Sequence, residues 1–261
     1  MNAIKNILVP FDFSPLAKNA LRYATNYCIN QVSTEITLLY CSNDKNHDEK
    51  SAMMTAAIES TKVPSNIHLI GKVIKSELTA GILDCIKEVK PHILIMGTKG
   101  SKSVSEKATT NTAKITLEAA CPVIVVPESY KGYKLKDIAL AIGVEEIDDP
   151  EVLTTLLVMA RRFDARIKVL CITADENLEL ADTKTERVLE YYFEKFYTDT
   201  TYISSSNIAE SILKYDETHA IDLLAIIPRN HIKHGDKSQG RLTSFLTMNS
   251  NIPLLTMNQP H

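Results

Sequence analysis

The chain alternates between short apolar runs and stretches in which apolar residues recur every three or four positions. The strand-length runs of its first half are residues 7–11, 36–40, 67–70, 93–96 and 123–126. Such runs are typical of strands buried on both faces of a parallel sheet. Helical spacing lies between them, as in residues 17–28 and 82–89. The alternation predicts right-handed β–α–β crossovers and a doubly wound α/β fold.

The second half of the chain repeats these landmarks at a nearly constant offset. Ile7 corresponds to Ile138 and Pro122 to Pro253, each 131 residues further on, and the run at 92–96 returns at 222–226. Two such units account for all 261 residues. We therefore expect two tandem five-stranded parallel-sheet domains at residues 1–130 and 135–258. The polar linker at 128–133 is too short for free domain motion, so the halves should pack together.

Composition narrows the class of protein. Lysine and arginine total 29 against 32 aspartates and glutamates, so no general attraction to nucleic acid or to an anionic membrane is expected. The longest apolar runs are strand-sized, so we expect no membrane span, and from residues 1–5 we expect no signal peptide. The five cysteines are dispersed without a CxxC pair, which is typical of reduced core thiols. A cytoplasmic protein is the expectation.

Two predicted strands of the first half end in residues suited to binding a ligand. Asp12 follows the first run, and Gly97-Thr-Lys-Gly100 follows the fourth, with a helix predicted from near Thr110. Ligands of open parallel sheets bind beyond the carboxyl ends of the strands. Glycines and a helix N-terminus there favour an anion. Each feature also has a simpler interpretation, because the glycines suit a tight turn and Asp12 can shape the turn before Ser14-Pro15.

Three motifs together resemble the universal stress protein family: Val9-Pro-Phe-Asp12-Phe-Ser14, Met96-Gly97-Thr-Lys-Gly100 and Ala120-Cys-Pro-Val-Ile-Val-Val-Pro127. The second half resembles the family through pattern and repeat offset. The resemblance implies a stress-linked role and a Rossmann-like, adenine nucleotide alpha hydrolase-like fold in each half. It also implies pairing through the last strands, here as an intramolecular pseudo-dimer, with a homodimer of the whole chain as a further candidate assembly.

One branch of this family binds ATP, and the resemblance assigns roles by position. Asp12 would lie beside the adenosine, Cys41 would line the adenine pocket, Met96 and Gly97 would border the ribose and phosphates, and Gly100 would shape the phosphate nest. The complete set of candidate nucleotide-binding residues is Pro10, Phe11, Asp12, Cys41, Met96, Gly97, Lys99, Gly100, Thr109, Thr110 and Asn111.

The chain departs from the family loop G-x2-G-x9-G-[S/T] at its end. The final pair falls on Thr109-Thr110 or Thr110-Asn111, so the last glycine is missing. A Cβ there crowds the phosphates, whereas a threonine hydroxyl can cap the helix. ATP is the expected cofactor, with Mg²⁺ as a candidate companion, although no acidic pair with metal spacing flanks the loop. A bare fold or another small ligand is the alternative.

The second half lacks this site. Gly143 stands where Asp12 stands in the first half, and the loop position reads Ile227-Pro-Arg-Asn230. Proline removes a backbone donor and fixes φ, which opposes a phosphate nest. We expect a structural pseudo-repeat.

Three further segments have candidate roles. His231, His234 and Asp236 form the densest cluster of residue types that bind metals. The two histidines could share one metal ion, but no third strong ligand stands at a suitable spacing, and a polar loop is the simpler interpretation. Residues 43–50 are predicted to form an exposed loop over the first site, where His47 would touch a ligand. Residues 179–194 are predicted to form an amphipathic helix.

Catalytic motifs are sparse in this sequence. Ser14 has no evident histidine partner, and the loop lacks a Walker lysine. The sequence therefore favours a sensor or adaptor that binds an adenine nucleotide, with no catalytic residue and at most slow ATP hydrolysis. The alternatives are an interaction scaffold without a nucleotide and a metal-dependent hydrolase.

Overall fold

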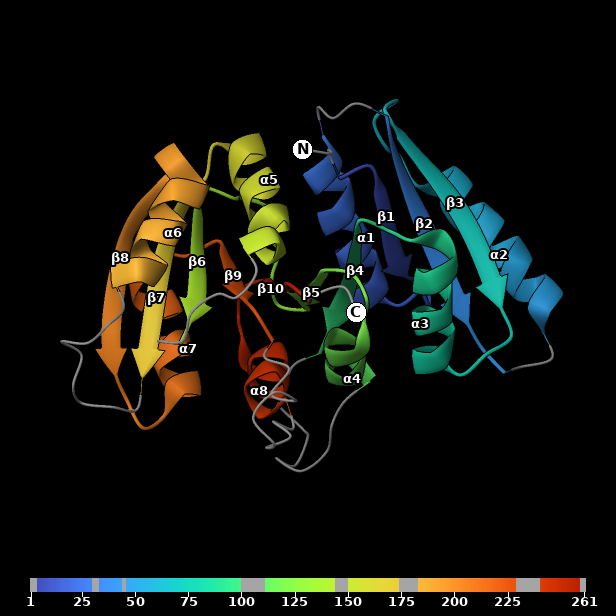
Figure 1. Cartoon of the computed structure of the whole chain (residues 1–261). Coiled ribbons are helices and arrows are strands. Elements are labelled where there is room, and N and C mark those ends of the chain that lie inside the picture. Colours follow the sequence, from blue (N-terminus) through green and yellow to red (C-terminus); the bar gives the residue numbers. More distant parts are fainter. Residues whose placement is uncertain are drawn as a thin grey trace.

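The computed structural model describes residues 4–29, 33–43, 46–99, 111–143, 150–173, 183–228 and 240–258. Figure 1 shows two halves side by side, each with a twisted sheet flanked by helices. The elements of the first half are β1 (Asn6–Pro10), α1 (Pro15–Cys28), β2 (Thr34–Cys41), α2 (His47–Ser60), β3 (Ile67–Ile74), α3 (Leu78–Val89), β4 (Ile93–Thr98), α4 (Asn111–Glu118) and β5 (Val123–Pro127).

The second half repeats the alternation of strand and helix. Its elements are β6 (Asp137–Ile142), the 3₁₀ turn η1 (Pro150–Leu153), α5 (Thr154–Phe163), β7 (Arg166–Thr173), α6 (Thr183–Phe193), the 3₁₀ turn η3 (Glu194–Phe196), β8 (Tyr197–Ser204), α7 (Ile208–His219), β9 (Leu223–Ile226), α8 (Arg241–Asn249) and β10 (Leu254–Thr256).

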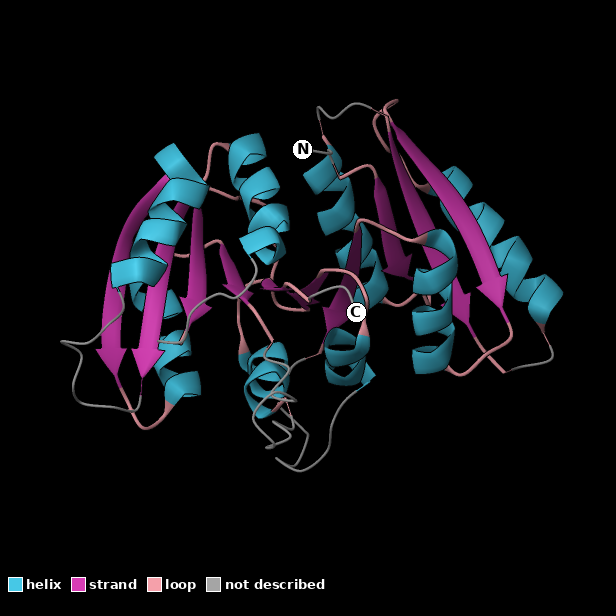
Figure 2. Cartoon of the chain, viewed as in Figure 1, coloured by secondary structure: helices cyan, strands magenta, loops and turns pink. Residues whose placement is uncertain are grey.

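All ten strands belong to one sheet, in the order β3-β2-β1-β4-β5-β10-β9-β6-β7-β8 (Figure 2). Within each half every strand pair is parallel, as predicted. The two five-stranded sheets join through their last strands, because β5 and β10 pair antiparallel with Leu255 opposite Ile124. The predicted intramolecular pairing therefore takes the form of one continuous sheet.

The strand registers confirm the internal repeat. Ile7 pairs with Ile36 in the first half, and Ile138 pairs with Ile167 in the second, which keeps the offset of 131 on both strands. The neighbours on the other side are Ile93 for Ile7 and Leu223 for Ile138, an offset of 130. The duplication therefore extends to the pairing of individual residues.

Helix α1 begins as the sequence predicts. Ser14 is the N-cap, its hydroxyl oxygen accepts a hydrogen bond from the Ala17 amide at 3.1 Å, and Pro15 is the first helical residue. In the second half Pro150 instead opens a 3₁₀ turn, and α5 follows from Thr154. Asp149 lies outside the described residues.

Helix α2 corrects one prediction. The loop expected at residues 43–50 ends early, because α2 begins at His47 and continues to Ser60. Only Met54 of this helix is buried, so no apolar stripe marks it in the sequence. Asp48 and Glu49 in its first turn favour the positive end of the helix dipole. For the helix predicted at 179–194, the structure has α6 from Thr183, and residues 179–182 lie outside the described part.

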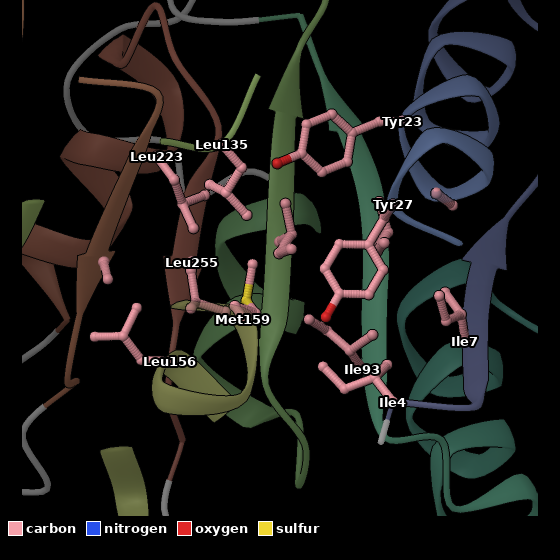
Figure 3. Close-up of a cluster of buried hydrophobic side chains, with 14 of the residues drawn as sticks. Ile4, Ile7, Tyr23, Tyr27, Ile93, Leu135, Leu156, Met159, Leu223 and Leu255 are labelled. Carbon is pink, nitrogen blue, oxygen red and sulfur yellow. The ribbon is translucent and has the colours of Figure 1, made fainter. Parts of the chain in front are cut away.

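The two faces of the sheet carry different cores. On one face a single apolar core spans both halves, built with side chains from α1, α2, α5 and α6. Figure 3 shows Tyr23 and Tyr27 of α1 and Leu156 and Met159 of α5 among the side chains of this core. On the other face the halves have separate cores, under α3 and α4 and under α7 and α8.

Aromatic residues and one arginine close the seam between the halves. The Tyr23 and Tyr133 rings lie 5.3 Å apart between centroids, as do those of Tyr27 and Phe163. Arg162 of α5 donates to the backbone oxygens of Tyr27 at 2.6 Å and Ile29 at 2.8 Å. The linker packs into this seam through its tyrosines, which explains why the halves pack together as predicted.

Candidate functional site

The strand order of the first half reverses between β1 and β4, which is the position of the ligand-binding crevice in doubly wound folds. From β1 the chain proceeds outward to β2 and β3, whereas β4 and β5 lie on the other side of β1. Ligands of open α/β sheets bind at such a switch point, beyond the carboxyl ends of the strands. One residue separates Asp12 from the end of β1, and Gly97 is the penultimate residue of β4, so both lie at this edge of the sheet.

Asp12 is exposed at this edge of the sheet, in the turn between β1 and α1. Its Oδ1 accepts a hydrogen bond from the Ser14 amide at 3.1 Å. Phe13 between them has φ 65°, a left-handed conformation that costs a non-glycine residue about 1–2 kcal/mol. Asp12 therefore shapes the turn before α1, as the simpler interpretation predicts, while the residue remains exposed at this edge of the sheet.

Cys41 and Met96 lie on the face of the sheet that α3 and α4 cover. Met96 belongs to that core, and Cys41 packs against it from the end of β2. The Cys41 sulfur lies so close to α3 that a Cβ on Gly81 would come within 2.9 Å of it. Burial raises the pKa of the Cys41 thiol to about 11, so the thiol stays protonated at neutral pH. Cys41 is suited to lining a pocket and unsuited to acting as a nucleophile.

Phe11 points to the opposite face from Cys41 and Met96. Its side chain is buried in the core that α1 and α2 cover, and it contacts Phe13 with ring centroids 5.4 Å apart. Phe13 in turn lies 5.4 Å from the Tyr40 ring. The structure thus separates the Phe11 side chain from the other candidate residues. Pro10 alternates with Phe11 along β1 and is half-buried.

Gly97 is required by the packing of α1 against β4. A Cβ at this position would lie 2.6 Å from Leu16 Cγ and 3.0 Å from the Leu16 oxygen. Lys99 is exposed just beyond β4, and Asn111 is exposed as the first residue of α4. Gly100, Thr109 and Thr110 lie outside the described residues.

The equivalent positions of the second half are built differently. Gly143 follows β6, and Ile227 and Pro228 follow β9, all three half-buried. The predicted cluster of His231, His234 and Asp236 lies outside the described residues. In the part of the chain that the structure describes, no group of three or more histidine, cysteine, aspartate or glutamate side chains is arranged to hold a metal ion.

Sequence reasoning missed a cleft between α1 and α2. It has a volume of about 810 Å³ and lies on the face to which Phe11 points. Lys18 and Arg22 stand four residues apart on α1, a spacing that also fits an ordinary solvated helix face.

The strand order is that of doubly wound α/β folds, a class in which ligands bind at the switch point. Residues 3–127 match the model of the universal stress protein family. Residues 3–127 therefore form a domain of this family, and the second half repeats the fold and register of the matched domain.

Solved structures share the fold over nearly the whole chain. A universal stress protein from Archaeoglobus fulgidus DSM 4304 is 15% identical with a TM-score of 0.72, and 99% of this chain and 97% of that chain are covered. A functionally unknown protein from Pseudomonas aeruginosa PAO1 is 14% identical with a TM-score of 0.68, covering 99% and 94%.

The cytoplasmic domain of a prokaryotic cation chloride cotransporter is also similar, at 12% identity and a TM-score of 0.58, covering 97% and 94%. Because this fold also serves as part of a transporter, function has to be argued from the site. No curated protein matches the sequence. None of the helices in the described residues is both long and apolar enough to cross a membrane.

Proposed function

We propose that the chain binds an adenine nucleotide in the crevice of its N-terminal domain, residues 1–130, and acts as a cytoplasmic stress-linked sensor or adaptor. The observation that carries the proposal is the arrangement of Asp12, Cys41 and Met96 at one edge of the sheet, at the switch point. The domain at 135–258 would support the fold without a nucleotide site of its own, since Gly143 and Pro228 occupy the corresponding positions.

Each part of the nucleotide has a matching group. The adenine would lie against the apolar surfaces of Pro10, Cys41 and Met96. The Asp12 carboxylate would accept hydrogen bonds from the ribose hydroxyls, since it is exposed at the crevice mouth. Phe11 would contribute its backbone, because its side chain belongs to the other core.

The phosphates would be bound by the loop that begins at Gly97 and by the N-terminus of α4. Lys99, Gly100, Thr109, Thr110 and Asn111 belong to this proposed phosphate site. A helix N-terminus and a glycine-containing loop together favour an anion. Mg²⁺ would accompany the triphosphate as its counter-ion, and any hydrolysis would be slow because no general base is assigned.

The proposal is tested by calorimetric titration with ATP, ADP and AMP at up to millimolar concentration. Asp12→Asn is the sharpest variant, because an amide oxygen can still accept from the Ser14 amide while the charge is lost. We expect Asp12→Asn to weaken binding about tenfold, the effect of losing one charged hydrogen bond. Gly100→Val should weaken binding too, because its side chain would crowd the proposed phosphate site. Pro228→Ala is the matched control in the second half and should leave affinity unchanged.

Two results would contradict the proposal. One is the absence of heat or thermal shift with all three nucleotides, and the other is unchanged affinity in both first-half variants. The first result would favour the alternative of an interaction scaffold without a nucleotide, which is consistent with the missing last glycine at Thr109-Thr110. Phosphate release with added Mg²⁺ should stay at background, and a rate above it would support the hydrolase alternative.

A further inference from the structure

The cleft between α1 and α2 is separate from the nucleotide crevice. Its volume of about 810 Å³ lies in the range of pockets that bind small molecules. Phe11, Phe13, Leu21 and Met53 give it apolar walls, with the small side chains of Ala56 and Ala57 leaving space along α2. It lies on the face of the sheet opposite Cys41 and Met96.

The second half differs at the corresponding place. Helices α1 and α5 align at an offset of 136, because the buried residues of α1 at 17, 20, 21 and 24 then correspond to the buried residues at 153, 156, 157 and 160. There α5 and α6 are in contact, since the Tyr192 hydroxyl lies 2.8 Å from that of Thr154, and Phe193 of α6 is fully buried.

The same alignment shows which residues open the cleft in the first half. Lys18, Arg22 and Thr25 line the cleft. Their counterparts in α5 are Thr154, Val158 and Arg161. The first half therefore has two basic side chains where the second half has Thr154, bonded to Tyr192 of α6, and Val158, packed against the core.

The charge of the cleft has one sign. Its ionisable lining residues are Lys18, Arg22 and Lys62, with no acidic residue among the described residues that line it. Arg22 donates to Asn19 Oδ1 at 2.9 Å and to the Tyr130 oxygen at 3.2 Å, so its guanidinium is held in place. Lys18 and Lys62 are exposed at the two ends of the cleft, and neither makes an ion pair within the described parts of the chain.

We propose that this cleft binds an amphipathic anion, an extended hydrocarbon chain that ends in a carboxylate. The chain would lie on Leu21 and Met53, with its far end at Phe11. The carboxylate would lie at the polar end, where Lys62 and the Asn26 amide offer donors. From Lys18 to Asn26 the helix rises about 12 Å, which suits a chain of medium length. This inference is independent of the nucleotide proposal.

Decanoate, tested on the full chain below its micelle concentration, is the direct probe, with decyltrimethylammonium as a ligand of equal chain length and opposite charge. We expect calorimetric binding of decanoate and at least a tenfold preference for it over the cation. Amide shifts in nuclear magnetic resonance spectra should map to α1 and α2. Equal binding of the two probes, or no binding of decanoate at millimolar concentration, would overturn the proposal.

Three variants test whether decanoate binds in this cleft. Ala56→Trp fills the cleft and should abolish decanoate binding, while Ala52→Trp, on the same helix but outside the cleft lining, should not. Lys62→Glu changes an exposed side chain, so the fold should persist and the preference between the two probes should reverse. Unchanged binding in both Ala56→Trp and Lys62→Glu would refute this location. A change of oligomeric state in Ala56→Trp alone would show instead that a second chain occupies the cleft.

Discussion

The two halves share strand order and register, yet they differ in residues at the carboxyl edge of the sheet and on the helices. Ile7 pairs with Ile36 in the first half, and its counterpart Ile138 pairs with the equivalent residue, Ile167, in the second. At the carboxyl edge, in contrast, Asp12 corresponds to Gly143 and Gly97 to Ile227. Buried strand positions are constrained by pairing and packing on both faces, whereas loop and helix positions are not. A duplicated fold can thus keep its geometry while the chemistry of each copy diverges.

The sharpest single difference lies between α3 and α7. These helices align at an offset of 130, which brings Ile86 of the first half to the position of Asp216 in the second. Ile86 is 4% exposed in an apolar core. Both carboxyl oxygens of Asp216 are also buried and have no hydrogen-bond partner among the described residues. Burial, with a smaller effect of Glu217, raises the pKa of Asp216 to about 7.

The variant with the largest expected effect on stability replaces Ile86 of the first half with the aspartate found at the equivalent position of the second half. Ile86→Asp removes a buried aliphatic side chain and places a carboxylate in its core. We expect the free energy of unfolding at pH 8 to fall by about 4 kcal/mol, the combined cost of a cavity and a buried charge. Urea denaturation followed by circular dichroism measures this loss.

Ile86→Asn is the control, because it creates a similar cavity without a charge. The two variants should have similar stability at pH 4 and diverge as pH rises. If Ile86→Asp were as stable as the wild type at pH 8, the core position of Ile86 would be wrong.

The reverse exchange, Asp216→Ile, should stabilise the protein by about 3 kcal/mol at pH 8. The carboxyl of Asp216 has a higher pKa in the folded state than the ordinary value of 3.8, so the folded state binds this proton more tightly. The wild type should therefore lose stability as pH rises from about 4 to 7, and the full penalty should remain above 7.

Asp216→Asn tests this sign, because it should flatten the same pH dependence without restoring an apolar contact. Unfolding curves at pH 4, 5.5 and 8 for the wild type and both variants make the comparison. A wild type that becomes more stable between pH 4 and 7, with Asp216→Asn showing the same slope, would contradict it.

The sequence predicted the parts of this fold that depend on regular burial. The strand runs and the repeat offset are visible because buried parallel strands need continuous apolar residues. Helix α2 was missed because it buries only Met54 and leaves Met53 exposed, so its pattern resembles a polar loop. The carboxyl-edge position of Asp12 followed from strand order, whereas the side of the sheet to which Phe11 points required the register and cores of the folded protein.

The contacts at the seam between the halves were predicted only in outline. A variant at this seam has the smallest expected effect on stability. The linker reads as polar, but Tyr130 and Tyr133 pack against Tyr23. The contacts of Arg162 join residues more than 130 positions apart, which no local pattern reveals. Such long-range contacts depend on how two finished halves meet.

Arg162→Met should lower the free energy of unfolding by about 2 kcal/mol. It removes charged hydrogen bonds to the backbone oxygens of Tyr27 and Ile29, and a cation–π contact with the Phe163 ring at 4.9 Å. Arg161→Met on the same helix is the matched control, because Arg161 pairs with exposed Glu194 at 3.6 Å and an exposed pair contributes little. Hydrogen exchange should rise at the carboxyl end of α1 in the first variant alone. Equal loss in both variants would show that Arg162 acts through the stability of α5 and not by joining the halves.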